Sequence, residues 1–214
     1  GEFFYRNTID FTQKDFLKII STGKEDKKPN LARYNNLSLS SSDLLLVGGG
    51  KDSAVALGLL KKSSRKLRTM IVNPTKAALA IVDASASSPP LVVHRTIDPE
   101  LLALNAKGYL NGHTPFSAYL AFLGITVAFL TGQEQVMVAN EKSADEGNVV
   151  FYGMEINHQY SKSFRFEQNF RQYVTEFLPN AATYFSVLRP LNDVQIAALF
   201  ASFPQYHTLF RSCN

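Results

Sequence analysis

Residues 44–53 read LLLVGGGKDS, a short apolar run followed by three consecutive glycines and a polar Lys-Asp-Ser. A continuous apolar run of this length is typical of a strand that is buried on both faces of a parallel sheet. Residues 52–60 then carry Ala, Val and Leu at helical spacing. The stretch therefore predicts a strand, a tight glycine turn and a helix, the repeating unit of α/β proteins.

The same alternation of strands and helices continues along the chain. We expect further strands at residues 70–72, 91–94 and 136–138, and helices at 75–84, 99–107, Thr114 to about Thr131, 164–177 and 193–203. Strands separated by helices predict an α/β fold with a doubly wound parallel sheet flanked by helices. Ligands of such sheets bind at the carboxyl ends of the strands.

Composition places the chain among ordinary globular proteins. Its 214 residues are 45% hydrophobic and 19% charged, which excludes the disordered and collagen-like classes. Cys213 is the single cysteine and cannot form an internal disulfide, so we expect a reducing compartment such as the cytoplasm. The chain opens without the pattern of a secretory signal. Residues 115–132 are uncharged, but polar side chains interrupt them, so we expect a helix covered by the sheet and no membrane partner.

Positive charge is concentrated in one part of the sequence. The net charge is +4, and Asp52 is the single acidic residue between Asp43 and Asp83, a stretch that is otherwise rich in lysine and arginine. Such a region attracts anions. Residues 61–68 fit a solvated helix C-terminus, with binding of a polyanion as the alternative. Because aromatic and basic residues do not alternate, we expect no nucleic-acid partner.

The glycine turn itself predicts a phosphate site. Successive N–H groups of Gly48, Gly49 and Gly50 can converge on an anion at the N-terminus of the following helix. A Walker A loop is excluded, because Leu45 and Asp52 occupy two of its required positions. A dinucleotide-binding fingerprint is excluded as well, since this segment lacks the third glycine of that motif and the acidic residue that should follow about 20 positions later. The alternative is a tight turn with no ligand.

Two polar runs follow the strand expected at 136–138. Residues 140–148 read NEKSADEGN and residues 157–163 read NHQYSKS. The second run packs side chains that donate, accept and ionise near neutral pH into consecutive places, which favours a binding or catalytic role over a plain surface loop. His113, in the run NGHTP at 111–115, either faces a ligand or simply precedes a helix.

The segment at 48–53 resembles the PP-loop of the N-type ATP pyrophosphatases, Ser-Gly-Gly-x-Asp-Ser, with Gly48 in place of the first serine. That family splits ATP into AMP and pyrophosphate and has an adenine-nucleotide α-hydrolase-like (HUP) fold. The resemblance implies that Gly48, Gly49, Gly50, Lys51, Asp52 and Ser53 bind ATP and that Asp52 positions magnesium. Asn73, at the end of the second expected strand, is also predicted to bind ATP.

The polar runs narrow this resemblance to one subgroup. Together with the glycine turn, NGHTP, NEKSA and NHQYSKS are similar to the UDP-N-acetylmuramoyl-L-alanyl-L-glutamate epimerases of peptidoglycan synthesis. The resemblance implies ATP-dependent adenylation of the terminal L-glutamate of a UDP-muramoyl dipeptide, release of pyrophosphate and inversion of the α-carbon. Adenylation removes the carboxylate charge that opposes loss of the α-proton. The expected base is Glu141, His158 or Lys162; the expected substrate contacts are His113, Asn140, Ser143, Asn157, Tyr160, Ser161 and Ser163.

Two alternatives and a domain division complete these expectations. The alternatives are another carboxylate-activating or tRNA-modifying PP-loop enzyme, and a nucleotide-binding domain without catalytic activity. Residues 12–20 predict an amphipathic helix within a lead-in at 1–42, which we expect to be the end of a missing domain. Residues 43–214 are expected to form the PP-loop domain.

Overall fold

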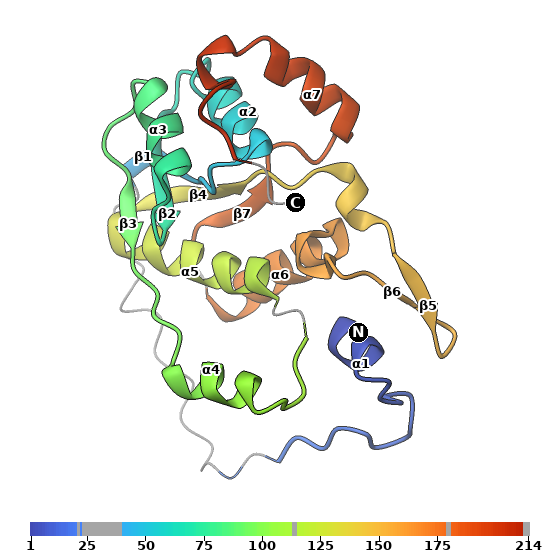
Figure 1. Cartoon of the computed structure of the whole chain (residues 1–214). Coiled ribbons are helices and arrows are strands. Elements are labelled where there is room, and N and C mark those ends of the chain that lie inside the picture. The colour runs from blue at the N-terminus through green and yellow to red at the C-terminus, as the bar shows by residue number, and fades with distance from the viewer. Residues whose placement is uncertain (21, 23–39, 113–114, 179–180, 212–214) are drawn as a thin grey trace.

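The computed structural model, which describes residues 1–20, 22, 40–112, 115–178 and 181–211, has a central parallel sheet with helices on both faces (Figure 1). Its five strands are β1 (Ser40–Leu46), β2 (Lys66–Val72), β3 (Leu91–Val93), β4 (Gln133–Val138) and β7 (Thr183–Ser186). They lie side by side in the order β3-β2-β1-β4-β7, and every pair is parallel. The predicted doubly wound sheet is therefore confirmed.

The strand order reverses between β1 and β4. From β1 the chain winds outward through β2 to β3, then returns to pair β4 with the other side of β1. Loops that leave β1 and β4 at their carboxyl ends therefore diverge over the two faces of the sheet. Such a switch point is where open α/β sheets bind their ligands.

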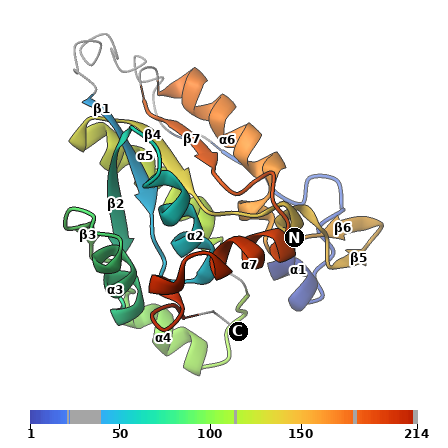
Figure 2. The ribbon, with the colours of Figure 1, turned by 90° about the horizontal axis from the view of Figure 1, so that it is seen from above.

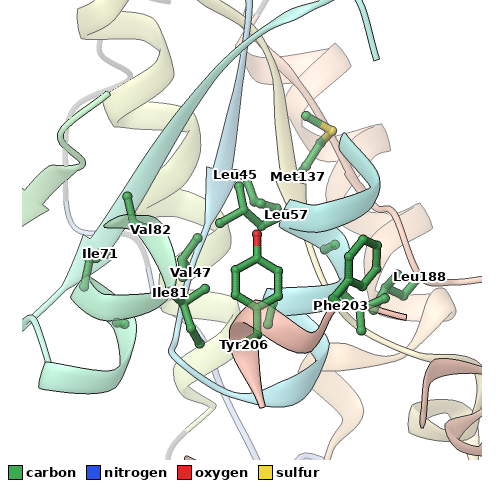
Figure 3. Close-up of a cluster of buried hydrophobic side chains, with 14 of the residues drawn as sticks. Leu45, Val47, Leu57, Ile71, Ile81, Val82, Met137, Leu188, Phe203 and Tyr206 are labelled. Carbon is green, nitrogen blue, oxygen red and sulfur yellow. The ribbon is translucent and has the colours of Figure 1, made fainter. Parts of the chain in front are cut away.

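Two hydrophobic clusters explain why residues 44–47 are apolar without alternation. Leu45 and Val47 pack with α2 (Lys51–Leu60), α3 (Lys76–Ala84) and α7 (Asp193–Ala201) in one cluster (Figure 3). Leu44 and Leu46 face the opposite cluster, with α5 (Phe116–Thr131) and α6 (Phe164–Phe177). Successive strand residues point to opposite faces, and both faces are covered, so each of these positions is buried.

Smaller elements surround this core, and Figure 2 shows several of them from above. They are α1 (Glu2–Arg6), α4 (Pro99–Ala106), the antiparallel hairpin of β5 (Val149–Phe151) and β6 (Met154–Ile156), and the 3₁₀ turns η2 (Lys142–Asp145), η3 (Tyr160–Lys162) and η4 (Pro204–Tyr206). The helix α4 buries none of its residues. Among the described residues, no helix is long and apolar enough to span a membrane.

The helix expected at residues 12–20 is wrong, because that stretch contains no helix and the N-terminal helix is α1. Leu17 and Ile19 are 76% and 86% exposed, so their apolar side has no surface to pack against. Asp15 has a left-handed backbone, with φ at 63°. A short amphipathic segment depends on tertiary packing for its helicity, and here that packing is missing.

The solvated helix C-terminus expected at residues 61–68 is correct for the start of this run, where Lys61 caps α2 and residues 61–65 are exposed, and wrong for its end. Helix α2 ends at Leu60, and β2 begins at Lys66, so the last three residues of this basic run belong to a strand. Arg65 bonds Asp43 of β1, which ties the start of β2 to the neighbouring strand. The strand expected at residues 70–72 is present, but its first residues were missed, because charged side chains occupy its solvent-exposed beginning.

Candidate active site

A cavity of about 550 Å³ lies at the carboxyl edge of the sheet, at the switch point between β1 and β4. The glycine turn after β1 and the polar run after β4 form part of its wall, and η3 adds Lys162. Asp193, at the start of α7, and Arg211 complete the polar side. Segments that are about a hundred residues apart in the sequence therefore meet in one site, as the parallel topology requires.

The glycine turn is shaped by hydrogen bonds and by close packing. Gly49 has φ at 93°, and a Cβ atom there would lie 2.8 Å from the backbone nitrogen of Ala78. The Ser53 hydroxyl accepts from the Gly49 N–H at 3.2 Å and donates to the Gly50 carbonyl at 2.9 Å. Gly49 and Ser53 thus stabilise the conformation of the turn, while Gly48 and Gly50 line the cavity at the N-terminus of α2.

Lys51 and Asp52 carry opposite charges at the first turn of α2. The Lys51 ammonium forms an ion pair with Asp193 and lies 3.8 Å from Asp52 Oδ1. Burial by itself lowers the pKa of Lys51, but the hydrogen bond with Asp193 and the nearby carboxylates outweigh it and raise the pKa. The pKa of Asp52 is raised, first by burial and then by the charges of Glu141 and Asp193, against Lys51 and Lys162.

Two carboxylate oxygens in this site are buried without a hydrogen-bond partner in the described part of the chain, Asp52 Oδ1 and Glu141 Oε2. An unpaired buried oxygen of this kind is costly, and a cation would relieve the cost. Magnesium binds carboxylate oxygens and commonly takes one or two from the protein, with phosphates and water completing its shell. The described residues contain no group of three or more His, Cys, Asp and Glu that could hold a metal. The residues present therefore fit a magnesium ion that a bound phosphate helps to hold.

Apolar side chains also line the cavity. They are Leu46, Met70 and Val72 at the ends of β1 and β2, and Phe116 and Leu120 of α5. Apolar side chains near a glycine turn at a helix N-terminus suit a nucleobase. The cavity thus offers both charged and apolar side chains, as a nucleoside triphosphate requires.

The MurL N-terminal domain family model matches residues 1–187, which include the glycine turn and both polar runs. The chain belongs to this family. A relative named UDP-N-acetyl-α-D-muramoyl-L-alanyl-L-glutamate epimerase, from a Micromonospora species, is 36% identical over all 214 residues, and one of that name from Xanthomonas oryzae is 33% identical over the same length. In both cases the chain spans 46% of the relative.

A solved structure shows the same fold. The U34-tRNA thiolase NcsA from Methanococcus maripaludis superposes with a TM-score of 0.52 at 13% sequence identity, covering 83% of this chain and 62% of that one. The expected PP-loop type of fold is thereby confirmed. At this identity the likeness concerns the fold alone.

The predicted base residues fall into two groups. Glu141 and Lys162 line the cavity, as does Asn140. His158 is not among the residues that line it; its backbone N–H donates to Asn148 at 3.1 Å, and its ring also contacts that side chain. The structure therefore brings two of the three ionisable candidates to the glycine turn.

Most of the predicted substrate contacts instead support the two polar runs from outside the cavity. Asn157 donates to the Ala144 carbonyl at 2.8 Å and so joins the second run to the first. Ser163 caps α6 by accepting from Phe166, and Ser161 is buried. Ser143 and Tyr160 do not line the cavity either. His113 lies outside the described residues.

Asn73 stands at the end of β2 but does not line the cavity within the described structure. Its amide donates to the Arg95 carbonyl at 2.8 Å and accepts from the Arg95 N–H at 2.6 Å. The guanidinium of Arg95 in turn lies 5.1 Å from the ring centre of Phe116, which does line the cavity. Asn73 therefore reaches the site through Arg95 and Phe116.

Sequence reasoning missed Asp193 and Arg211, which line the cavity, and Arg189, which contacts the two polar runs. Asp193 begins α7 after the Asn192 cap, so its position signals a helix start rather than a ligand. The backbone N–H of Arg211 donates to the Gly49 carbonyl at 2.9 Å, a contact between remote segments that only the fold creates. Arg189 follows β7, a strand that no apolar run marks in the sequence. None of the three lies in a recognisable motif.

Proposed function

We propose that this chain binds ATP with magnesium and adenylates the terminal L-glutamate carboxylate of UDP-N-acetylmuramoyl-L-alanyl-L-glutamate, so that the α-carbon can be inverted for peptidoglycan synthesis. One observation carries the proposal: the cavity joins a glycine turn at a helix N-terminus to two buried carboxylate oxygens without partners. The names of the relatives support the choice of substrate. The lone cysteine and the use of ATP support a cytoplasmic reaction.

The polar side of the cavity supplies what adenylyl transfer from ATP needs. Backbone N–H groups of the turn and the N-terminus of α2 attract the phosphates. Lys51 adds a mobile positive charge, and Arg211, whose backbone is bonded to the glycine turn, adds a second cation on the same side. A glutamate carboxylate oxygen attacks the α-phosphorus, the bond from that phosphorus to the bridging oxygen breaks, and pyrophosphate leaves. The products are the acyl-adenylate and pyrophosphate.

Asp52 and Glu141 are the residues that would hold magnesium, through their buried oxygens. When bound, the ion supplies positive charge that offsets the charge of the phosphates. Without it, the two carboxylates would repel the anionic ligand that the glycine turn attracts. Metal and triphosphate are therefore expected to bind together.

Removal of the α-proton is assigned to Lys162 or Glu141, because these ionisable side chains line the cavity and His158 does not. The adenylated carboxyl group no longer carries the charge that opposes carbanion formation, so a base of moderate strength suffices. The proton is taken from one face of the α-carbon and returned to the other. Hydrolysis of the adenylate then releases AMP and the inverted dipeptide.

Isotope exchange between pyrophosphate and ATP tests this proposal on the full chain. We expect exchange that depends on the UDP-muramoyl dipeptide and on magnesium, and its loss in Asp52→Asn. Solvent deuterium should enter the α-carbon of glutamate, and changing the true base, Lys162→Ala or Glu141→Gln, should stop this uptake. Lys162→Ala should leave pyrophosphate release largely intact. Exchange that needs a different acid or an RNA, or no exchange at all, would contradict the proposal.

A further inference from the structure

Arg189 lies between the two polar runs and contacts both. Its Nη1 donates to the Glu141 carbonyl at 2.8 Å, and its Nη2 donates to the Lys162 carbonyl at 2.7 Å. The same guanidinium donates to Glu167 of α6, from Nη2 at 3.0 Å and from Nε at 3.3 Å. One planar group therefore bonds the backbone of both base candidates that line the cavity, Glu141 and Lys162.

The environment of Arg189 fixes the direction of these bonds. The side chains of Arg189 and Glu167 are 13% and 5% exposed, so the pair is largely withdrawn from water. The ring of Phe164 lies 6.0 Å from the guanidinium carbon. A buried ion pair is a weak source of stability, because desolvation cancels much of the attraction. What the rigid fork of arginine provides is geometry, since its donors point in fixed directions.

The two polar runs differ in their other contacts with β7 and with the segment that follows it. The first run has further contacts: Ser186 donates to the Asn140 carbonyl at 2.6 Å, and Lys142 donates its N–H to the Leu191 carbonyl at 3.0 Å. The second run is bonded to this segment through the contact from Arg189 to Lys162. The position of Lys162 relative to Glu141 should therefore depend strongly on Arg189.

We propose that Arg189 is a positioning residue that sets the separation of Glu141 and Lys162 across the cavity. This inference rests on the proposed function in so far as these two residues act on the substrate. It requires no contact between Arg189 and the substrate. Arg189 acts from behind the two runs, through their carbonyl groups, and Glu167 holds its charge in place.

Hydrogen exchange on the full chain tests the proposal without any need for activity. In Arg189→Ala, amides of residues 159–163 should exchange faster, those of residues 140–143 should change less, and those of the glycine turn should not change. The matched control is Arg65→Ala, because Arg65 bonds the buried Asp43 and Glu134 at the other edge of the sheet. That control should leave both polar runs unchanged.

A second variant guards against simple unfolding. Arg189→Lys keeps a positive charge beside Glu167, but one ammonium group cannot reproduce the planar fork that reaches both carbonyls. It should fold and still show faster exchange at 159–163. Unchanged exchange there, or a uniform increase over the whole chain, in this folded variant would overturn the proposal.

Steady-state kinetics distinguish a positioning role of Arg189 from a purely structural one. If the chain catalyses the proposed reaction, Arg189→Ala should lower kcat for deuterium uptake by about 10- to 100-fold, the cost of a small misplacement, while KM for ATP stays within about twofold. Added guanidinium should restore part of the rate in Arg189→Ala, whereas the rate of Arg65→Ala should be near that of the wild type and should not rise. A raised KM for ATP with an unchanged kcat would contradict the positioning role. Absence of activity in the unmodified chain would refute the proposed function, whereas the exchange measurement would still decide the role of Arg189.

Discussion

The two edges of the central sheet carry cavities of nearly equal size, about 550 Å³ at the carboxyl edge and about 570 Å³ at the amino edge. The two edges differ in how their acidic side chains are paired. At the amino edge, the buried Asp43 accepts two hydrogen bonds from Arg65, which also bonds Glu134. At the carboxyl edge, Asp52 Oδ1 and Glu141 Oε2 are buried without such partners. The size of a cavity therefore does not distinguish a binding site here, but unmet hydrogen-bonding capacity does.

This difference has an energetic meaning. The satisfied carboxylate of Asp43 contributes to holding β1, β2 and β4 together, whereas the unsatisfied oxygens at the other edge cost stability in the free protein. Such a cost persists in a fold when the groups serve a ligand. The unpaired carboxylates at the carboxyl edge should therefore favour ligand binding and lower the stability of the free protein. The paired carboxylate at the amino edge should raise that stability and contribute nothing to ligand affinity.

The largest effect we expect comes from Asp52→Asn. Losing a charged partner of the metal should lower magnesium-dependent ATP affinity by about 10- to 100-fold, which corresponds to ~1.5–3 kcal/mol for an interaction with a charged group. The melting temperature of the free protein should rise slightly, because the raised pKa shows that the folded state disfavours the charge of Asp52. Calorimetry with and without magnesium, together with thermal unfolding, measures both changes.

Asp43→Asn is the matched control, since it removes a carboxylate of the same strand-to-helix region at the opposite edge. It should lower the melting temperature, because Arg65 loses its buried partner, and it should leave the affinity for magnesium and ATP within about twofold. The comparison between the two edges fails if Asp43→Asn weakens ATP binding as much as Asp52→Asn does.

Sequence reasoning found the parts of the molecule whose cause is local. The run at 44–53 predicts β1, the glycine turn and α2, because burial on both faces and a helix N-terminus leave a direct mark on residue types. It also placed the glycine turn, Glu141 and Lys162 in one site, and in the structure Glu141, Lys162 and residues of the turn line one cavity. In contrast, β7 was missed, because Tyr184 and Ser186 are buried while Thr183 is exposed, so no apolar run marks the strand.

What could not be predicted depends on long-range contacts. Arg189 reaches the two polar runs because β7 pairs with β4. Arg211 reaches the cavity because the chain after η4 returns to Gly49. Conversely, Ser163 and Asn157 are of types that often bind substrates, but here Ser163 caps α6 and Asn157 joins the two polar runs. A polar side chain that satisfies its own backbone looks the same in a sequence as one that faces a substrate.

A smaller effect is expected from Asp193→Asn. Asp193 is 66% exposed and holds the ammonium of Lys51, so its removal should free Lys51 for phosphate and tighten ATP binding by about two- to fivefold, in keeping with ~0.2–1 kcal/mol for an exposed ion pair. Lys51→Ala should instead weaken binding. If Asp193→Asn weakens ATP binding in calorimetry, Asp193 contributes to the ligand site and does not compete for Lys51.

The smallest effect we expect is a pH dependence that runs in opposite directions for stability and for binding. Because burial and neighbouring carboxylates raise the folded-state pKa of Asp52, its favourable contribution to stability is fully present below its unfolded-state pKa and is lost as the pH rises through the folded-state pKa. Magnesium requires the ionised form, so ATP affinity should fall as the pH is lowered toward that pKa.

Titration calorimetry from neutral to mildly acidic pH measures this change, and Asp52→Asn is the reference that corrects for protonation of ATP itself. The wild-type protein and Asp43→Asn should share the steeper pH dependence, because both retain Asp52, while Asp52→Asn should show the dependence of the nucleotide alone. Thermal unfolding over the same range should show the free wild-type protein gaining stability relative to Asp52→Asn as the pH falls. Parallel pH profiles for wild type and Asp52→Asn would mean that Asp52 is not the carboxylate whose ionisation couples metal binding to the glycine turn.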